Sequence, residues 1–393
     1  MDRLLLLTGR GLRAFGFGFS AVLVGLRLEG GGLSAAQIGV AVGLGLAAAS
    51  LTGLLSVTLA SRVGRRRALA ATGVLMAVTG LDLGLATDHV LLILAGATGM
   101  LGVASVDLGP FAPLEQAALT EVVTAERRNV SFGRYSLFGG LFNAAGGLAA
   151  TLAVAGTERG YFLLYALIGA ITAVLPLLMS TAVESGGASS LLGPLRDRNT
   201  RRVLAGLSGL FALDSLAGGF VANAVIAYWL HVRFGAEPGL LGPFFAAVAL
   251  LQALSYEVSG RLSVRFGLIN TMVFTHLPSN VLLVAVALSP SLPWALGLLL
   301  ARFLLSQMDV PARQAYIVSI VPAAERAAAV ALTGAVRGVA QSFGPALAGV
   351  AIGAAAYGVP FYAGGGLKIV YDAALFAAFR RRRAAHESLR SAG

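Results

Sequence analysis

The 393-residue sequence contains no cysteine, and charged residues make up only 12% of it. Without cysteine there can be no disulfide and no thiolate metal site. Soluble domains carry about 25% charged residues, so the low charge argues against a soluble fold. Walker loops, GxSxG elbows and HExxH motifs are also missing from the sequence. We therefore expect no cofactor, no metal ion, no enzymatic activity and no direct use of ATP.

Long apolar runs are the dominant feature, and hydrophobic residues make up 57% of the chain. A helix needs about 20 apolar residues to cross a bilayer. The runs do not alternate as the strands of a membrane barrel do. The sequence therefore predicts an all-α integral membrane protein. We predict twelve transmembrane helices, at about residues 10–30, 37–60, 68–87, 90–119, 131–155, 160–180, 203–230, 239–260, 268–288, 293–317, 327–353 and 356–379.

The longest polar interruption is VESGGASSLLGPLRDRNTRR, at residues 183–202. It separates six predicted helices from the next six. We therefore predict an N-terminal six-helix bundle (1–182), a central loop (183–202), a C-terminal six-helix bundle (203–379) and a basic tail (380–393).

The basic residues are distributed unevenly between the two ends of the predicted helices, and the net charge is +11. Most arginines fall in the loops on the side of both termini, whereas the opposite side carries Arg27, Arg159 and Arg233. The positive-inside rule then places both termini and the central loop in the cytoplasm, with the chain integral to the inner (plasma) membrane. The basic residues in short loops and the tail would contact lipid headgroups, so we expect no nucleic-acid partner.

Two segments of the first half recur in the second half. PLEQAALTEVVTAERR (113–128) matches PARQAYIVSIVPAAERA (311–327), including the prolines Pro113 and Pro311. SRVGRRR (61–67) matches GRLSVRFG (260–267), where Arg62-x-Gly64 aligns with Arg265-x-Gly267. Two parallel six-helix halves are a common design of transporters.

With its twelve predicted helices and its internal repeat, the sequence resembles the major facilitator superfamily. In that family the loop between helices two and three reads Gly-x-x-x-Asp-Arg-x-Gly-Arg-Arg. The chain supplies Arg62, Gly64, Arg65 and Arg66, but has Val57 and Ser61 at the glycine and aspartate positions. The second copy keeps Gly260, Arg265 and Gly267, with Val264 at the aspartate position. The resemblance implies a two-lobed bundle that works as a monomer by alternating access, with helices one, four, seven and ten lining a central cavity.

Charged residues near the cytoplasmic ends of the helices form a predicted conformational network. Asp309 and Arg313 are spaced i, i+4 and share a helix face. Glu115 could pair with Arg62 or Arg66. Such ion pairs must break and reform when the lobes rock. The predicted network consists of Arg62, Gly64, Arg66, Glu115, Arg265, Gly267, Asp309 and Arg313.

Charged residues deeper in the helices are candidates for substrate binding or coupling. Asp107 and Asp214 lie near the middle of helices four and seven, where a desolvated carboxylate can load and release a proton; the alternative is a permanent ion pair. Arg302 could bind an anion or belong to a fixed ion pair. Arg337 could bind an anion, or pair with Asp309 or Glu257.

Other polar residues in the helices favour structural roles. Interhelical hydrogen bonding is favoured over substrate contact for Gln307, Asn143, Gln252 and Gln341. Lys368 and Asp372, again i, i+4, are predicted to neutralise each other, and Glu257 is a further proton site to consider. His231 and His276 have no partner at metal spacing and are predicted to be structural.

The sequence predicts a secondary transporter that moves a small molecule and is coupled to protons. Export of an amphiphilic compound is favoured, because the surface at mid-depth is mostly apolar. The rival transport hypothesis is uptake or exchange of a small organic anion, which rests on Arg302 and Arg337. A hypothesis from another class is a membrane sensor or scaffold that does not transport, which the departures at Val57 and Ser61 allow.

Overall fold

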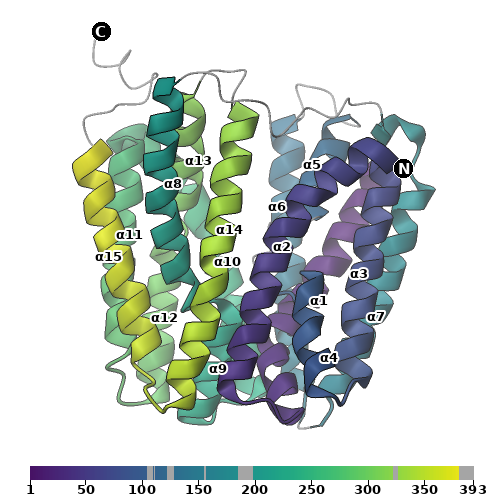
Figure 1. Cartoon of the computed structure of the whole chain (residues 1–393), viewed down its shortest axis with the longest axis horizontal. Coiled ribbons are helices and arrows are strands. Elements are labelled where there is room, and N and C mark those ends of the chain that lie inside the picture. The colour runs from purple at the N-terminus through teal and green to yellow at the C-terminus, as the bar shows by residue number, and fades with distance from the viewer. Residues whose placement is uncertain are drawn as a thin grey trace. The chain divides into compact units, whose positions relative to one another are not determined.

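The computed structural model describes residues 1–103, 109, 111–121, 128–154, 156–184, 198–321 and 326–379, and all regular elements in these ranges are helical (Figure 1). The first elements are α1 (Asp2–Gly30), α2 (Ala35–Val63), α3 (Arg65–Leu85), α4 (His89–Leu94), η1 (Ala95–Thr98), α5 (Phe111–Glu121), α6 (Arg128–Ala149), η3 (Ala150–Leu152), α7 (Glu158–Val174), η4 (Leu175–Leu178) and η5 (Thr181–Glu184). They are followed by α8 (Arg198–Gly219), α9 (Asn223–Phe234), α10 (Pro238–Phe266), α11 (Leu268–Val286), α12 (Leu292–Leu305), α13 (Asp309–Ile320), α14 (Arg326–Gly353) and α15 (Val359–Phe379). Of the predicted central loop 183–202, residues 185–197 lie outside the described residues, and its two ends belong to η5 and α8. The tail 380–393 also lies outside the described residues.

The helices follow the twelve predicted spans, but three of the spans are divided. Span four consists of α4 with η1, and then α5. Span seven consists of α8 and α9, and span ten of α12 and α13. Left-handed glycines, Gly99 at φ 73° and Gly102 at φ 70°, follow η1, and such a conformation ends a helix. In span ten Pro311 falls in the first turn of α13, where its missing N–H is not needed. The span is therefore broken just before the proline.

Six helical segments within the described residues are each long and apolar enough to cross a bilayer: Asp2–Gly30, Ala35–Val63, Arg65–Leu85, Glu158–Leu178, Arg201–Phe234 and Leu268–Val286. Shorter apolar helices occur at His89–Thr98, Pro238–Gln252 and Leu292–Leu305. The first and last of these short helices belong to divided spans, so the breaks shorten their continuous apolar length.

The chain folds into two compact units. The first consists of Met1–Ser189, Ala222–Ala249 and Pro345–Ala355, and within it α3 packs along α7 and α1 along α6. The second consists of Ser190–Val221, Leu250–Gly344 and Ala356–Gly393, and within it α11 packs against α15 and α12. Small residues allow close helix contacts inside a unit: a Cβ at Gly146 of α6 would overlap the carbonyl of Phe15 in α1. These units are not the repeated halves predicted from the sequence. The halves 1–182 and 203–379 describe the internal repeat and stay a prediction.

The turn that carries the repeated Arg-x-Gly motif has the same backbone conformation in both copies. Gly64 joins α2 to α3 at φ 90°, ψ 153°, and Gly267 joins α10 to α11 at φ 86°, ψ 162°. L-residues with a side chain rarely adopt this conformation, which explains the glycine in each copy. The predicted repeat is therefore confirmed at these two turns.

In the first copy the turn is held by a carboxylate. Glu184 of η5 accepts hydrogen bonds from the backbone N–H groups of Arg65, at 2.6 Å, and Arg66, at 3.1 Å. A negative charge at a helix N-terminus satisfies unpaired N–H groups and the helix dipole. The Glu184 carboxylate thus ties the end of the sixth span to the start of the third.

We predict that Gly64→Ala destabilises the protein by about 1–3 kcal/mol, because a Cβ is strained at this φ and would lie 2.9 Å from Glu184 Oε2. Thermal unfolding of the purified protein in detergent is the measurement. The matched control is Gly140→Ala in α6, where an added Cβ meets no atom within 4 Å and alanine favours the helix. Equal stability of the two variants would contradict the prediction.

Candidate functional site

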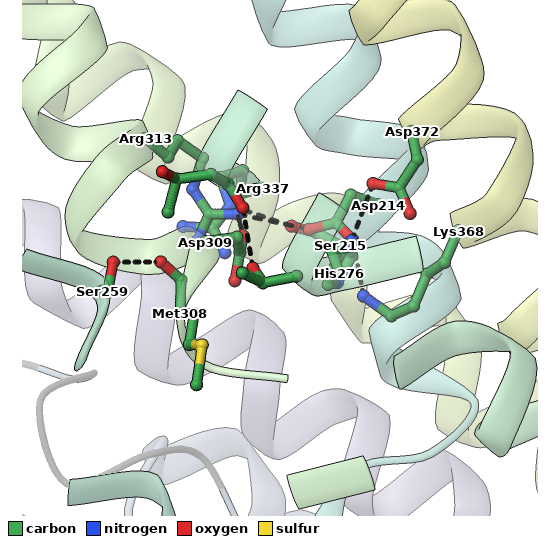
Figure 2. A network of polar contacts seen from close by, with 12 residues as sticks. Asp214, Ser215, Ser259, His276, Met308, Asp309, Arg313, Arg337, Lys368 and Asp372 are labelled. Atoms are coloured by element: carbon green, nitrogen blue, oxygen red, sulfur yellow. Dashed lines mark hydrogen bonds and ion pairs between the residues drawn. The ribbon is translucent and has the colours of Figure 1, made fainter. Parts of the chain in front are cut away.

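The break in span ten exposes backbone carbonyls, and serines from neighbouring helices satisfy them. Ser259 of α10 donates to the carbonyl of Met308, and Ser255 donates to that of Leu304. Just before the break, the carbonyl of Arg302 keeps its helical bond from the Ser306 N–H and also accepts from Ser279 of α11 at 3.4 Å. Unpaired backbone groups are costly inside a membrane, and serine hydroxyls are a usual remedy. The break therefore persists, and α13 begins at Asp309 in the interior of the second unit (Figure 2).

Asp214, in α8, is the centre of a buried charge network (Figure 2). Lys368 Nζ of α15 donates to its Oδ1 at 2.5 Å, and Arg313 of α13 donates to its Oδ2 at 3.4 Å. Arg313 also donates to Asp309 at 2.6 Å, which is the pair that their i, i+4 spacing predicts. These two carboxylates and two cations balance one another, as buried charges must.

His276, in α11, extends the network toward a third carboxylate. Its Nδ1 lies 2.9 Å from Asp372 Oδ1, and its Nε2 lies 3.9 Å from Asp214 Oδ1. Asn280, one turn further along α11, donates to Asp372 Oδ2 at 2.8 Å. The imidazole is thus positioned between two carboxylates from different helices. His276, Asp214 and Asp372 are all at least nine-tenths buried.

The His276–Asp372 pair is suited to hold one proton. Among the described residues, the ion pair of Asp372 is with His276, whereas Asp214 and Asp309 have Lys368 and Arg313. A buried carboxylate without a counter-charge is strongly unfavourable. A proton shared by the imidazole and the carboxylate removes that cost, with either group as its carrier.

Two arginines of the second unit complete the site. Arg337 of α14 donates from Nε to Ser215 Oγ at 3.1 Å. Arg302 of α12 is 7% exposed, and its guanidinium lies 4.8 Å from the centroid of the Phe303 ring. Within the described part of the chain, neither arginine has a carboxylate within ion-pair distance.

The first unit contains a separate buried charge cluster. Arg13 of α1 donates to Glu115 Oε1, and Tyr135 of α6 donates to Glu115 Oε2 at 2.7 Å. The Arg10 guanidinium lies over the Tyr135 ring, 4.4 Å from its centroid. The cluster joins α1, α5 and α6.

The predicted pairing of Glu115 with Arg62 or Arg66 is wrong. Glu115 is 2% exposed and faces Arg13, whereas Arg62 is exposed at the end of α2. Arg66 donates instead to the carbonyls of Pro176 and Leu177. Sequence position placed Glu115 near the membrane surface, but its helix turns the carboxylate into the unit.

Three further predictions need correction. Lys368 and Asp372 do not pair with each other: both face the interior, but the long lysine reaches α8 and the short aspartate meets α11. Arg337 bonds to Ser215 rather than Asp309, and the side chain of Glu257 lies outside the described residues. His276, predicted to be structural, belongs to the charge network.

The ion pairs and hydrogen bonds described above for the charge network around Asp214 involve none of the remaining predicted site residues. Asp107 lies outside the described residues. Asn143 of α6 donates to the Ala14 carbonyl at 3.3 Å, and the carbonyl of Gln341 contacts Gly219. Gln252 in α10 and Gln307 between α12 and α13 are half-buried. Arg265 is exposed at the end of α10.

The sequence carried signals for the residues that were missed. Lys368 is the only lysine among the 29 basic Lys and Arg residues, and it lies inside an apolar span. A lone cation of a different type at that depth indicates a specific partner. His276 and Asn280 are spaced i, i+4 and so share a face. Neither signal, however, names Asp214 or Asp372 as the partner.

Comparison with known families assigns the chain to a class. The sequence model of the Major Facilitator Superfamily matches residues 6–306 and 208–393. These matches together cover nearly the whole chain, so the chain belongs to this family. It is an integral membrane protein and a secondary transporter, not an enzyme.

Individual relatives agree with the fold of this family. The uncharacterized membrane protein YJR124C of Saccharomyces cerevisiae is 23% identical in an alignment that covers 86% of this chain and 85% of that protein. The crystal structure of the nucleoside transporter NupG superposes with a TM-score of 0.80 at 16% identity, covering 97% of this chain and 100% of that one. A D-xylose-proton symporter superposes with a TM-score of 0.72 at 15% identity, covering 96% and 97%. At these identities the two structures support the fold alone.

We predict that the Asp214–Lys368 pair shows strong energetic coupling. Lys368→Met or Asp214→Asn alone should destabilise the protein by about 3–5 kcal/mol, because each leaves a buried charge without its partner. The double variant should lose much less unfolding free energy than the two single losses added together. Thermal unfolding in detergent measures the stability of the two single variants and the double variant.

Arg159→Gln is the control for this cycle, because Arg159 is exposed and its loss should change stability by no more than about 0.5 kcal/mol. Additive losses in the double variant would show that the two residues do not act as a pair.

Proposed function

We propose that this secondary transporter is coupled to protons and that the His276–Asp372 pair, next to Asp214, carries the proton. The observation behind the proposal is the buried series Asp372–His276–Asp214, with contacts of 2.9 Å and 3.9 Å. An intramembrane carboxylate or histidine in such a series is a usual proton relay.

The same oxygen of Asp214 offers a way to couple the proton to movement. Lys368 Nζ and His276 Nε2 both face Asp214 Oδ1. A proton that reaches this oxygen removes its negative charge and weakens the Lys368 ion pair. Lys368 then needs a new counter-charge, so α15 and α8 lose one of their contacts. Protonation and helix packing would thereby be linked.

Further features of the proposal rest on the sequence. Asp107, at mid-depth of span four, is a second candidate proton site. We place both termini in the cytoplasm because most arginines lie in the loops on that side, and expect the transporter to work as a monomer. Export of an amphiphilic compound is the proposed direction, because the predicted spans are mostly apolar at mid-depth.

The test is flux into sealed proteoliposomes driven by a pH gradient, with nucleosides, pentoses, amphiphilic cations and organic anions as substrates. Asp214→Asn and His276→Asn should abolish accumulation driven by the gradient but leave exchange of substrate across the membrane, since exchange needs no net proton movement. His231→Asn, the same change at a half-exposed histidine of the first unit, should accumulate as the wild type does.

Wild-type coupling in both Asp214→Asn and His276→Asn would exclude this proton site. Accumulation in inside-out vesicles on acidification of the lumen would support export, and accumulation in right-side-out vesicles would support uptake. Binding without flux of any of these compounds would indicate the sensor or scaffold.

A further inference from the structure

Beside the break in span ten, two side chains each have a buried polar atom without a hydrogen-bond partner among the described residues. Arg302 is 7% exposed and Ser306 is 6% exposed. Within the described residues, Arg302 Nε and Ser306 Oγ are both buried and have no partner. Buried polar groups in proteins are usually satisfied. Several other buried atoms in the described residues also have no partner, but Arg302 Nε and Ser306 Oγ belong to residues four apart in the chain.

These two side chains lie on one helix face. The backbone N–H of Ser306 donates to the carbonyl of Arg302 at 2.9 Å, so the helical turn between them is intact. Residues four apart on an intact turn are neighbours on the helix surface. The carbonyls of Leu304 and Met308, beside the break, already receive hydroxyl groups from Ser255 and Ser259. The break therefore does not account for the two unpaired groups.

The charges around this face are unbalanced. Arg313 and Lys368 are each paired with a carboxylate in the described part of the second unit, whereas Arg302 and Arg337 are not. A buried cation without a counter-charge is unfavourable and calls for an anion. Within the described residues the site thus combines a buried guanidinium N–H and a buried hydroxyl, both without a partner, with excess positive charge.

We propose that Arg302 and Ser306 bind the carboxylate of a small organic anion, which is the transported substrate. The guanidinium edge that contains Nε offers two parallel donors that match the two carboxylate oxygens, and the serine hydroxyl offers a third. The proposal rests on the proposed function, and narrows the amphiphilic substrate to one that carries a carboxylate.

The first experiment measures binding rather than transport. Thermal unfolding of the purified protein is followed at fixed pH with benzoate, phenylacetate or lactate, and with benzamide as the uncharged match of benzoate. Carboxylates should raise the Tm of the wild type, because a ligand bound to the folded state stabilises it, and benzamide should not. Arg302→Met should lose the shift. Ser306→Ala should need about tenfold more benzoate for the same shift, through loss of one hydrogen bond to a charged group.

Arg159→Gln removes the same charge at an exposed position and should keep the full benzoate shift. No shift of the wild type with any of the three carboxylates, or an undiminished shift in Arg302→Met, would overturn the proposal.

A second measurement needs no ligand. If Arg302 awaits an anion, Arg302→Met removes an uncompensated buried charge and should raise the Tm of the ligand-free protein, as substitutions at binding sites can. Arg302→Lys keeps the charge and should give no gain. A lower Tm for Arg302→Met would show that the arginine is a structural cation, and would overturn the proposal.

The two proposals fail in different ways. If the wild type binds no carboxylate but its flux is driven by the pH gradient, the proposed anion site is wrong and proton coupling stands. If carboxylates bind and this binding depends on Arg302, but flux does not respond to the pH gradient, proton coupling is wrong and the anion site stands.

Discussion

The second unit depends on one constraint: a charge inside an apolar bundle must be matched by another charge or a proton. Asp214 meets this constraint through Lys368 and Arg313, which come from two other helices. The ion pairs therefore determine which faces of α8, α13 and α15 turn inward. The apolar cluster that includes Phe211, Met272 and Tyr371 packs around them, and the Phe211 ring lies 5.7 Å from the Arg313 guanidinium. Packing and electrostatics thus specify the same helix orientations.

The broken spans serve this network. A continuous helix presents its side chains at a fixed rotation, whereas a break allows the second segment to begin at a new angle. In span ten the break interrupts the regular backbone hydrogen bonding of the helix, and two serines of α10 donate to carbonyls beside it. The result is that Asp309 and Arg313 lie within reach of α8, while Arg302 and Ser306 occupy the segment before the break. The break in the helix thus positions both the Asp309–Arg313 pair and the pair of polar residues Arg302 and Ser306.

Much of the fold could be predicted from the sequence because bilayer thickness imposes a length on every span, and the Arg-x-Gly turns mark equivalent points of the repeat. Ion pairs between residues close in the sequence could be predicted as well, since Asp309 and Arg313 are four residues apart and do pair. The spacing of Lys368 and Asp372 is the same, yet they bind other helices, because a shared face says nothing about what lies opposite it. The partners of Glu115 and Asp214 come from distant parts of the chain. Periodicity cannot identify such contacts, since they depend on helix rotation and on the breaks.

The composition of the first unit has a consequence for biogenesis. Residues 222–249 and 345–355 pack with the N-terminal segment although they lie far along the chain. In α14, Gly349 faces the backbone of α2 at Gly39, with an added Cβ only 3.0 Å from the Gly39 Cα. A ribosome must therefore synthesise the chain almost to Ala355 before the first unit can acquire all of its helices. Until then α2 exposes a strip of glycine and alanine to lipid or to the insertion machinery, so assembly of this unit ends after synthesis of most of the protein rather than halfway through it.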